Sequence, residues 1–253
     1  MNHFKSSAEL KASAREHLLG HYGTVIGAYL LVGLFTGLAS VVVAFLVPLY
    51  SVVNAVIYYA INFFISILTG LFTSGLCFLY LKLACGRPVS VGDLFYGFQL
   101  CPDKAILLQA WFSIFTLLAS LPKYVISYKM NSESMSLFIA DEQIMQVSKY
   151  MLPYSLSLIL SGVISVFLYL IYGQAFFLLH DFPQHSAREL LIRSRRLMSH
   201  HKGRLFYLSV SFIPLLLLGS LSGVALLWVL PYIAATEAEF FLDLIRNNTE
   251  AAS

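Results

Sequence analysis

Charge is scarce in this sequence. Only 11% of its 253 residues are Asp, Glu, Lys or Arg, whereas an average soluble domain has about 25%. Hydrophobic residues make up 58% of the chain, which also contains 20 Phe and 15 Tyr. Such aromatic content is typical of membrane–water interfaces. The composition therefore excludes a soluble globule and predicts an all-α, multi-pass (polytopic) membrane protein.

Several signals of processing and of metal or redox chemistry are also missing. The first 20 residues are polar and lack both an apolar core and a small-residue cleavage site, so no secretory signal peptide is predicted. The few cysteines have neither CxxC spacing nor a nearby histidine cluster; they are Cys77, Cys85 and Cys101. We expect no metal site and no cofactor.

Ionisable residues are absent near the middle of every predicted span. Ion-coupled transport usually needs such residues, because they are costly in a bilayer and are kept for use. The spans offer only uncharged amides, which we expect to form helix-to-helix hydrogen bonds: Asn62, Gln109 and Gln174.

The hydrophobic runs predict six transmembrane spans within a single integral membrane domain covering residues 1–253, because each run approaches the roughly 20 residues that a bilayer requires. Residues 51–59 are expected to form an outer connection, and Pro122 is expected to end the third span. The segment 219–223 breaks the last apolar run into two, although one tilted helix there would give five spans instead. The six spans are predicted at about 23–48, 60–83, 105–121, 153–179, 205–221 and 224–241.

Short amphipathic helices are predicted at the cytoplasmic membrane interface, at about 6–20, 90–98 and 186–202. Each starts with a serine followed three residues later by an acidic residue, the pattern of a capping box. In the first helix the apolar face is Leu10, Ala14, His17 and Leu18. In the third it is Leu190, Leu191, Ser194, Leu197 and Met198, which follow helical spacing.

The first and third of these helices align without gaps at an offset of 180 residues. Ser6 then falls on Ser186, Glu9 on Glu189 and Gly23 on Gly203. Both copies are followed at once by a spanning run. We therefore hypothesise three repeated units, each an interfacial helix followed by a transmembrane hairpin, which favours six spans.

The distribution of cations predicts the orientation, since cytoplasmic loops carry an excess of Lys and Arg. With the N-terminus in the cytoplasm and six spans, 13 of the 16 Lys and Arg residues lie inside. Only Lys123, Lys129 and Lys149 lie outside, and five spans would move Arg246 alone. The N-terminus is thus predicted to be cytoplasmic, and three hairpins would return the C-terminus to the same side.

Both ends of the chain resemble a known family. The segments SRRLMSHHKGRLFYLSVSFI and LLWVLPYIAATEAEFF, with SAELKASAREHLLGHYG near the N-terminus, are similar to the uncharacterised bacterial membrane-protein family called domain of unknown function 975. Ser199 or His200 stands where that family usually has a glycine, so the end of the helix before His201 is expected to differ. The resemblance implies a multi-pass protein of the bacterial cytoplasmic (plasma) membrane, and it implies no reaction.

The sequence offers few residues suited to catalysis. The residues available for acid–base or metal chemistry near the interface are His180 with Asp181, His200 with His201, and Glu237 with Glu239. The members of each pair are adjacent or two apart, so they diverge on a helix instead of converging on a substrate. We therefore expect no enzyme and no catalytic residues, with an interfacial membrane enzyme as the least favoured class.

A basic cluster lies just before the fifth span: Arg193, Arg195, Arg196, Lys202 and Arg204. Juxtamembrane cations attract anionic lipid headgroups by about 1 kcal/mol per charge, although they also act as topology determinants and snorkelling anchors. The setting explains this charge without nucleic acid, so none is expected as a partner. The sequence favours a non-catalytic membrane module that binds anionic lipid or a membrane-protein partner; a transporter or lipid-handling carrier is the alternative.

Overall fold

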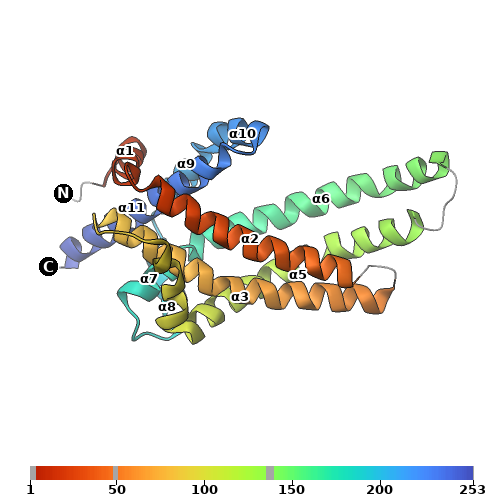
Figure 1. The fold of residues 1–253 in the computed structure, drawn as a ribbon, viewed down its shortest axis with the longest axis horizontal. Coiled ribbons are helices and arrows are strands. Elements are labelled where there is room, and N and C mark those ends of the chain that lie inside the picture. Colours follow the sequence, from red (N-terminus) through yellow and green to blue (C-terminus); the bar gives the residue numbers. More distant parts are fainter. Residues whose placement is uncertain (1–3, 48–50, 135–139, 253) are drawn as a thin grey trace. The chain divides into compact units, whose positions relative to one another are not determined.

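The computed structural model describes residues 4–47, 51–134 and 140–252, and it describes side chains for residues 4–47, 51–130 and 148–247. Within these ranges the chain is helical and has no strand (Figure 1). The elements before residue 135 are α1 (Ser7–Leu18), α2 (Tyr22–Leu46), α3 (Val52–Ala84), the 3₁₀ turn η1 (Val91–Phe95), α4 (Tyr96–Gln99) and α5 (Pro102–Ser134). Those that follow are α6 (Ala140–Tyr172), α7 (Ala175–Asp181), α8 (Ala187–Leu197), α9 (Lys202–Val210), α10 (Ile213–Ser222) and α11 (Leu226–Ala252).

Five helical segments of the described chain are long and apolar enough to cross a membrane, so the protein is an integral, multi-pass membrane protein. They are Tyr22–Leu46, Val52–Ala84, Pro102–Met130, Ser148–Asp181 and Lys202–Ser222. Each overlaps one of the first five predicted spans, although the predicted end of the first span, at residue 48, lies outside the described residues. The count agrees with the five-span alternative and not with the preferred six.

The sixth predicted span, at about 224–241, lies in α11, which does not qualify as a spanning helix. The break before it is real, because α10 ends at Ser222 and Gly223 has a positive φ of 67°. The first 18 residues of α11, however, contain Glu237, Glu239 and Asp243. Three carboxylates are too costly for a lipid-exposed span, and α11 keeps them in contact with protein cations, as described below.

Two predicted helix ends were wrong. Residues 52–59 belong to α3 and do not form an outer connection. Pro122 lies inside α5 and does not end it, as Pro153 lies inside α6. A proline removes one backbone donor, but an apolar helix in a bilayer has no better place for its remaining backbone groups than its own hydrogen bonds.

The chain forms two compact units. The first contains the residues up to Phe35, Gly70–Leu108 and the chain from Leu170 on; the second lies within Thr36–Thr69 and Gln109–Tyr169. The single membrane domain covering residues 1–253 stays a prediction, and each unit is described by itself.

The capping chemistry follows the sequence prediction. The Ser6 amide donates to Glu9 Oε2 at 2.6 Å, and the Ser186 amide donates to Glu189 Oε2 at 2.8 Å. In both boxes the amide of the glutamate donates back to the serine hydroxyl. The middle copy is a 3₁₀ turn, in which the Ser90 amide donates to Asp93.

The helix starts also keep the 180-residue offset. Helix α1 starts at Ser7 and α8 at Ala187, while α2 starts at Tyr22 and α9 at Lys202. Most of each predicted apolar face is buried: Leu10, Ala14 and Leu18 in α1, and Leu190, Leu191 and Ser194 in α8, with Met198 at its cap. The other two predicted members, His17 and Leu197, are half-buried. These faces pack on other helices of the first unit, α1 on α11 and α8 on α7.

Within the first unit, α11 runs antiparallel to α9 and α10. Arg204 at the start of α9 pairs with Asp243, the rings of Phe212 and Tyr232 pack edge to face at 5.2 Å, and Gly219 lies against Leu226. Residues later in α9 and α10 therefore contact residues earlier in α11, as expected for antiparallel helices. The third predicted unit is a hairpin whose second arm is the charged helix α11.

Candidate functional site

Helix α8 has one apolar face and one strongly basic face. Its first turn is held by the Ser186–Glu189 box, and because Glu189 accepts hydrogen bonds from the Ser186 amide and hydroxyl, the pKa of Glu189 is lowered. Outside this buried face lie four exposed arginines, with Arg193 at its edge: Arg188, Arg193, Arg195 and Arg196. Among the residues that the structure describes, no carboxylate lies within ion-pair distance of these four guanidinium groups.

The predicted headgroup residues divide into two groups. Arg193, Arg195 and Arg196 are exposed, and the guanidinium of Arg193 lies 4.7 Å from the centre of the Phe182 ring. Lys202 is half-buried and has an interaction within the chain. Arg204 is half-buried and directed into protein contacts, so its charge is used internally.

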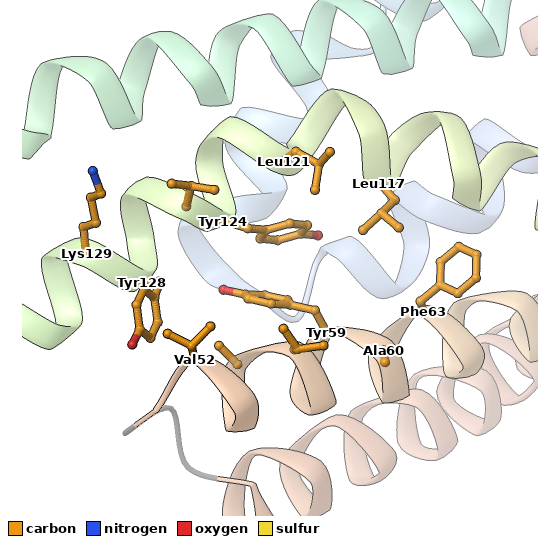
Figure 2. Close-up of a pocket in the computed structure, with 12 residues that line it drawn as sticks. Val52, Tyr59, Ala60, Phe63, Leu117, Leu121, Tyr124, Tyr128 and Lys129 are labelled. Carbon is orange, nitrogen blue, oxygen red and sulfur yellow. The ribbon is translucent and has the colours of Figure 1, made fainter.

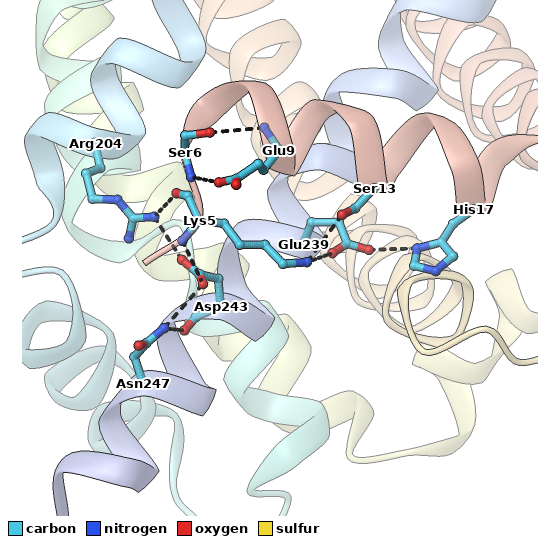
Figure 3. A network of polar contacts seen from close by, with 9 residues as sticks. All are labelled: Lys5, Ser6, Glu9, Ser13, His17, Arg204, Glu239, Asp243 and Asn247. Carbon is cyan, nitrogen blue, oxygen red and sulfur yellow. Dashed lines mark hydrogen bonds and ion pairs between the residues drawn. The ribbon is translucent and has the colours of Figure 1, made fainter. Parts of the chain in front are cut away.

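A polar network joins α1, α9 and α11 (Figure 3). Its centre is the pair of carboxylates Glu239 and Asp243 on α11, which are only 5% and 7% exposed. His17 Nδ1 lies 2.7 Å from Glu239 Oε1, and Lys5 Nζ lies 3.6 Å from Glu239 Oε2. A buried charge costs free energy unless it is paired and hydrogen-bonded, and Glu239 meets two basic side chains of the N-terminal segment.

Asp243 is neutralised from a different direction. Arg204 Nη2 donates to Asp243 Oδ2 at 2.8 Å and also to the Lys5 carbonyl at 2.8 Å. The Asn247 amide donates to Asp243 Oδ1 at 3.2 Å. The guanidinium of Arg204 lies between the rings of Phe4 and Phe240, 4.7 and 5.3 Å from their centres. Residues from both ends of the chain thus close around one arginine.

Two neighbouring basic residues show the effect of this packing. Lys11 donates to the Ser211 carbonyl at 3.2 Å and lies 4.0 Å from the centre of the Phe212 ring; burial, and then the charge of Arg15, lowers the pKa of Lys11. His201 packs on Phe4, with ring centres 4.8 Å apart. Burial is the main cause that lowers the pKa of His201.

The residue pairs considered for catalysis do not come together with one another. His180 Nε2 lies 2.8 Å from the Ser74 carbonyl, beside the ring of Phe78. Asp181 and His200 are exposed, and Glu237 is half-buried. Glu239 meets His17, a pairing that the sequence analysis missed because the two residues are 222 positions apart.

The chain matches a family over nearly its whole length. The family, described as "Protein of unknown function (DUF975)", matches residues 1–248. The chain belongs to the DUF975 family. No curated protein and no solved structure matches it.

The resemblance seen at the two ends of the sequence is thereby confirmed for this DUF975 protein. Those two ends are also the parts that meet in the structure, since the N-terminal segment supplies Lys5 and His17 and the C-terminal helix supplies Glu239 and Asp243.

Proposed function

We propose that this DUF975 protein is a non-catalytic module of the bacterial cytoplasmic membrane that binds anionic lipid headgroups through helix α8. The proposal rests on the exposure of the α8 arginines and on their lack of described carboxylate partners. Arg193, Arg195 and Arg196 are exposed on one helix, and no described carboxylate neutralises them. A fixed cluster of unpaired cations next to a span attracts anionic headgroups.

The way α8 is held supports this use. Leu190 and Leu191 are buried against the protein, so rotation of the helix about its axis would expose them. The basic face therefore stays directed away from the protein. The capping box at Ser186 fixes its first turn. Headgroups would therefore meet cations that are already in position, which lowers the entropic cost of binding.

The geometry of the first unit supports cytoplasmic placement of both chain ends. Helix α11 returns along α9 and α10, and the 17 steps from Leu226 to Asp243 cover about 26 Å at 1.5 Å per residue, close to the roughly 30 Å of a bilayer core. Its far end binds α1 through Glu239, and it binds the segment just before α1 through Asp243. Since the cation distribution favours a cytoplasmic N-terminus, α8, α1 and the C-terminal helix would share the cytoplasmic side.

The environment of the acidic residues favours a non-catalytic role. Glu239 and Asp243, the most buried carboxylates of α11, are engaged by cations that also join α1 to α9. Removing either carboxylate would disconnect helices, which is the behaviour of a packing element. A general acid or base instead needs a free position facing a substrate.

The test compares the parent with the triple variant Arg193→Gln, Arg195→Gln, Arg196→Gln. Full-length protein in a neutral detergent is titrated with phosphatidylglycerol or phosphatidylcholine, and bound lipid is counted by native mass spectrometry. At about 1 kcal/mol per charge, losing three cations should weaken phosphatidylglycerol binding roughly 100-fold and leave phosphatidylcholine binding unchanged.

A matched control removes three exposed but scattered cations: Arg15→Gln, Arg87→Gln and Lys149→Gln. It changes the net charge by the same amount, so it should retain phosphatidylglycerol binding if the α8 cluster is the site. Equal binding by the parent and the α8 variant, or equal losses in both triple variants, would reject the proposal.

A further inference from the structure

The second unit contains a polar cavity between two of its spanning helices. It has a volume of about 420 Å³ and lies between α3 and α5. Its polar lining comes from Asn62, Ser66, Gln109, Ser113, Thr116 and Ser120. Ligand pockets in proteins commonly measure about 300–1,000 Å³, so the cavity is large enough for part of a small molecule.

The chemistry of the lining restricts what can enter. None of the residues that line the cavity is Asp, Glu, Lys, Arg or His. An ion in such a position would have no counter-charge, and burying an unpaired ion is prohibitive in a low-dielectric medium. The cavity therefore fits an uncharged group with hydroxyl, carbonyl or amide functions.

Some of the hydrogen-bonding capacity of the lining is unused. Ser66 and Ser113 bond to each other at 2.9 Å, and Asn62 donates to the Tyr58 carbonyl of its own helix. The Gln109 amide is half-buried and has no hydrogen bond to any described residue, and the same holds for the buried hydroxyl of Ser120. Within a bilayer there is no bulk water to satisfy these groups, so a ligand gains by meeting them.

An apolar cavity adjoins the polar one. It has a volume of about 550 Å³, and Tyr59, Phe63, Leu117 and Tyr124 line both cavities. Figure 2 shows the rings of Tyr59 and Tyr124 facing each other across the space between α3 and α5, and their centres are 4.3 Å apart. Beyond them the lining is aliphatic and aromatic as far as Lys129.

We propose that the two cavities form one binding site for a neutral amphiphile, a molecule with an uncharged hydroxyl-bearing head and a hydrocarbon chain. The head occupies the polar cavity and meets Gln109 and Ser120, while the chain passes the two tyrosines into the apolar cavity. A phospholipid is excluded because its phosphate would find no cation beside Gln109. The site is separate from helix α8 and does not depend on the function proposed for it.

The test uses monooleoylglycerol as the neutral probe and the oleoyl lysolipid of phosphatidylglycerol as its charged counterpart. Binding of each to the full-length protein in detergent is measured by native mass spectrometry. Because the charged probe would also bind at α8, the two probes are compared in the variant Arg193→Gln, Arg195→Gln, Arg196→Gln, which should bind the neutral probe at least tenfold more tightly than the charged one. Equal binding of both probes would mean that the polar cavity does not discriminate between neutral and charged headgroups, and it would reject the proposal.

Two kinds of variant locate the site. Gln109→Leu with Ser120→Ala removes the unused polar groups at nearly constant volume and should weaken monooleoylglycerol binding at least tenfold. Ala60→Phe fills the apolar cavity and should weaken binding of both probes. The control Ser155→Ala with Ser165→Ala changes hydroxyls of α6 that bond to their own helix and do not line either cavity; it should bind like the parent.

The melting temperature in detergent serves as the measure of intact folding in every variant. A cavity variant that keeps the melting temperature of the parent and still takes up monooleoylglycerol like the parent overturns the proposal. So does a native dimer of the parent that becomes monomeric in the cavity variants, because a second copy would then cover the site. Loss of monooleoylglycerol binding with the melting temperature retained supports the proposal.

Discussion

Asp243 and Glu239 are almost sealed from solvent, and each depends on cations contributed by other helices. This arrangement makes their free-energy contribution asymmetric. Replacing a buried ion pair with apolar residues is often tolerated, whereas removing one partner leaves an uncompensated charge. Single substitutions should therefore be more harmful than paired ones.

We expect Asp243→Asn to destabilise the protein by about 3 kcal/mol, because Arg204 would keep a half-buried charge without its 2.8 Å partner. For a chain of this size the melting temperature should fall by roughly 6–12 °C. Thermal unfolding in detergent, followed by intrinsic fluorescence, measures the shift.

The exposed substitution Arg196→Gln is the control and should leave the melting temperature within about 1–2 °C of the parent, as surface changes usually do. The double variant Arg204→Met with Asp243→Asn should recover part of the loss. If the two single losses simply add, Arg204 and Asp243 are not energetically coupled and the pairing seen in the structure is unimportant for stability.

His201 gives a pH dependence with a defined sign. Burial, followed by the positive charges of Arg204 and His200, lowers its pKa from the ordinary 6.5, while Asp243 acts weakly in the opposite direction. The unfolded chain then binds the His201 proton at a higher pH than the folded protein does. The stability contributed by the neutral ring is complete above about pH 6.5 and is lost as the pH falls below that value.

We accordingly expect the melting temperature of the parent to fall more between pH 7.5 and 5.5 than that of His201→Gln. The other histidines titrate in both proteins, so the difference between the two profiles isolates His201. Parallel profiles would contradict the assignment, and a steeper fall in the variant would reverse its sign.

At the scale of elements, α3 packs very closely against the segment formed by η1 and α4. A Cβ atom on Gly75 would lie 1.7 Å from the Leu94 carbonyl oxygen, and one on Gly97 would lie 2.0 Å from the Leu71 carbonyl oxygen. Both obstacles are backbone atoms, so they cannot move aside as a flexible side chain can. By contrast, a Cβ atom on Gly37 of α2 would meet no atom within 4 Å.

Gly75→Ala should therefore destabilise the protein by at least the 1–3 kcal/mol typical of overpacking, because α3 and η1 must separate. Gly162→Ala is the matched control on α6, where nothing lies within 4 Å of the added methyl group. The control should be neutral or stabilising by up to about 1 kcal/mol, since alanine favours a helix over glycine. Thermal unfolding of the two variants would contradict this account if they behaved alike.

The elements also show which structural features the sequence predicted. Capping boxes and the 180-residue repeat were predictable because they depend on residues three apart or on a fixed register, as Ser6 with Glu9 illustrates. The ends of α3 and α5 were misplaced because polar side chains and a proline were taken as breaks, whereas α3 includes residues 52–59 and α5 continues through Pro122.

Long-range pairings were beyond the sequence analysis. Nothing local indicates that His17 should meet Glu239, since the apolar face of α1 specifies that the helix is covered but not by which partner. The predicted helix-to-helix bonds of Asn62 and Gln109 were wrong for the same reason: Asn62 bonds to its own helix, and Gln109 has no described partner. Their shared position at one cavity became visible only when α3 and α5 were placed together.

At the scale of the whole molecule, the contact between α1 and α11 makes a topological prediction. Five candidate spans alone would put the two termini on opposite sides of the bilayer, yet Lys5 and His17 bond directly to α11 (Figure 3). We expect reporters fused to the N-terminus and the C-terminus to be active on the same, cytoplasmic side. A C-terminal fusion that is active only in the periplasm would overturn both the returning path of α11 and the repeated-hairpin hypothesis.

The pairing of His17 with Glu239 also has a consequence for biosynthesis. Translation delivers Glu239 222 residues after His17, and at about 5–20 residues per second that interval lasts roughly 10–45 s. During this time α1 has left the ribosome but lacks the helix that covers Leu10, Ala14 and Leu18. The apolar face of α1 must therefore remain uncovered, at the membrane surface, until α11 has been synthesised. Any chain that ends before α11 will keep this face exposed, which distinguishes it from the complete protein.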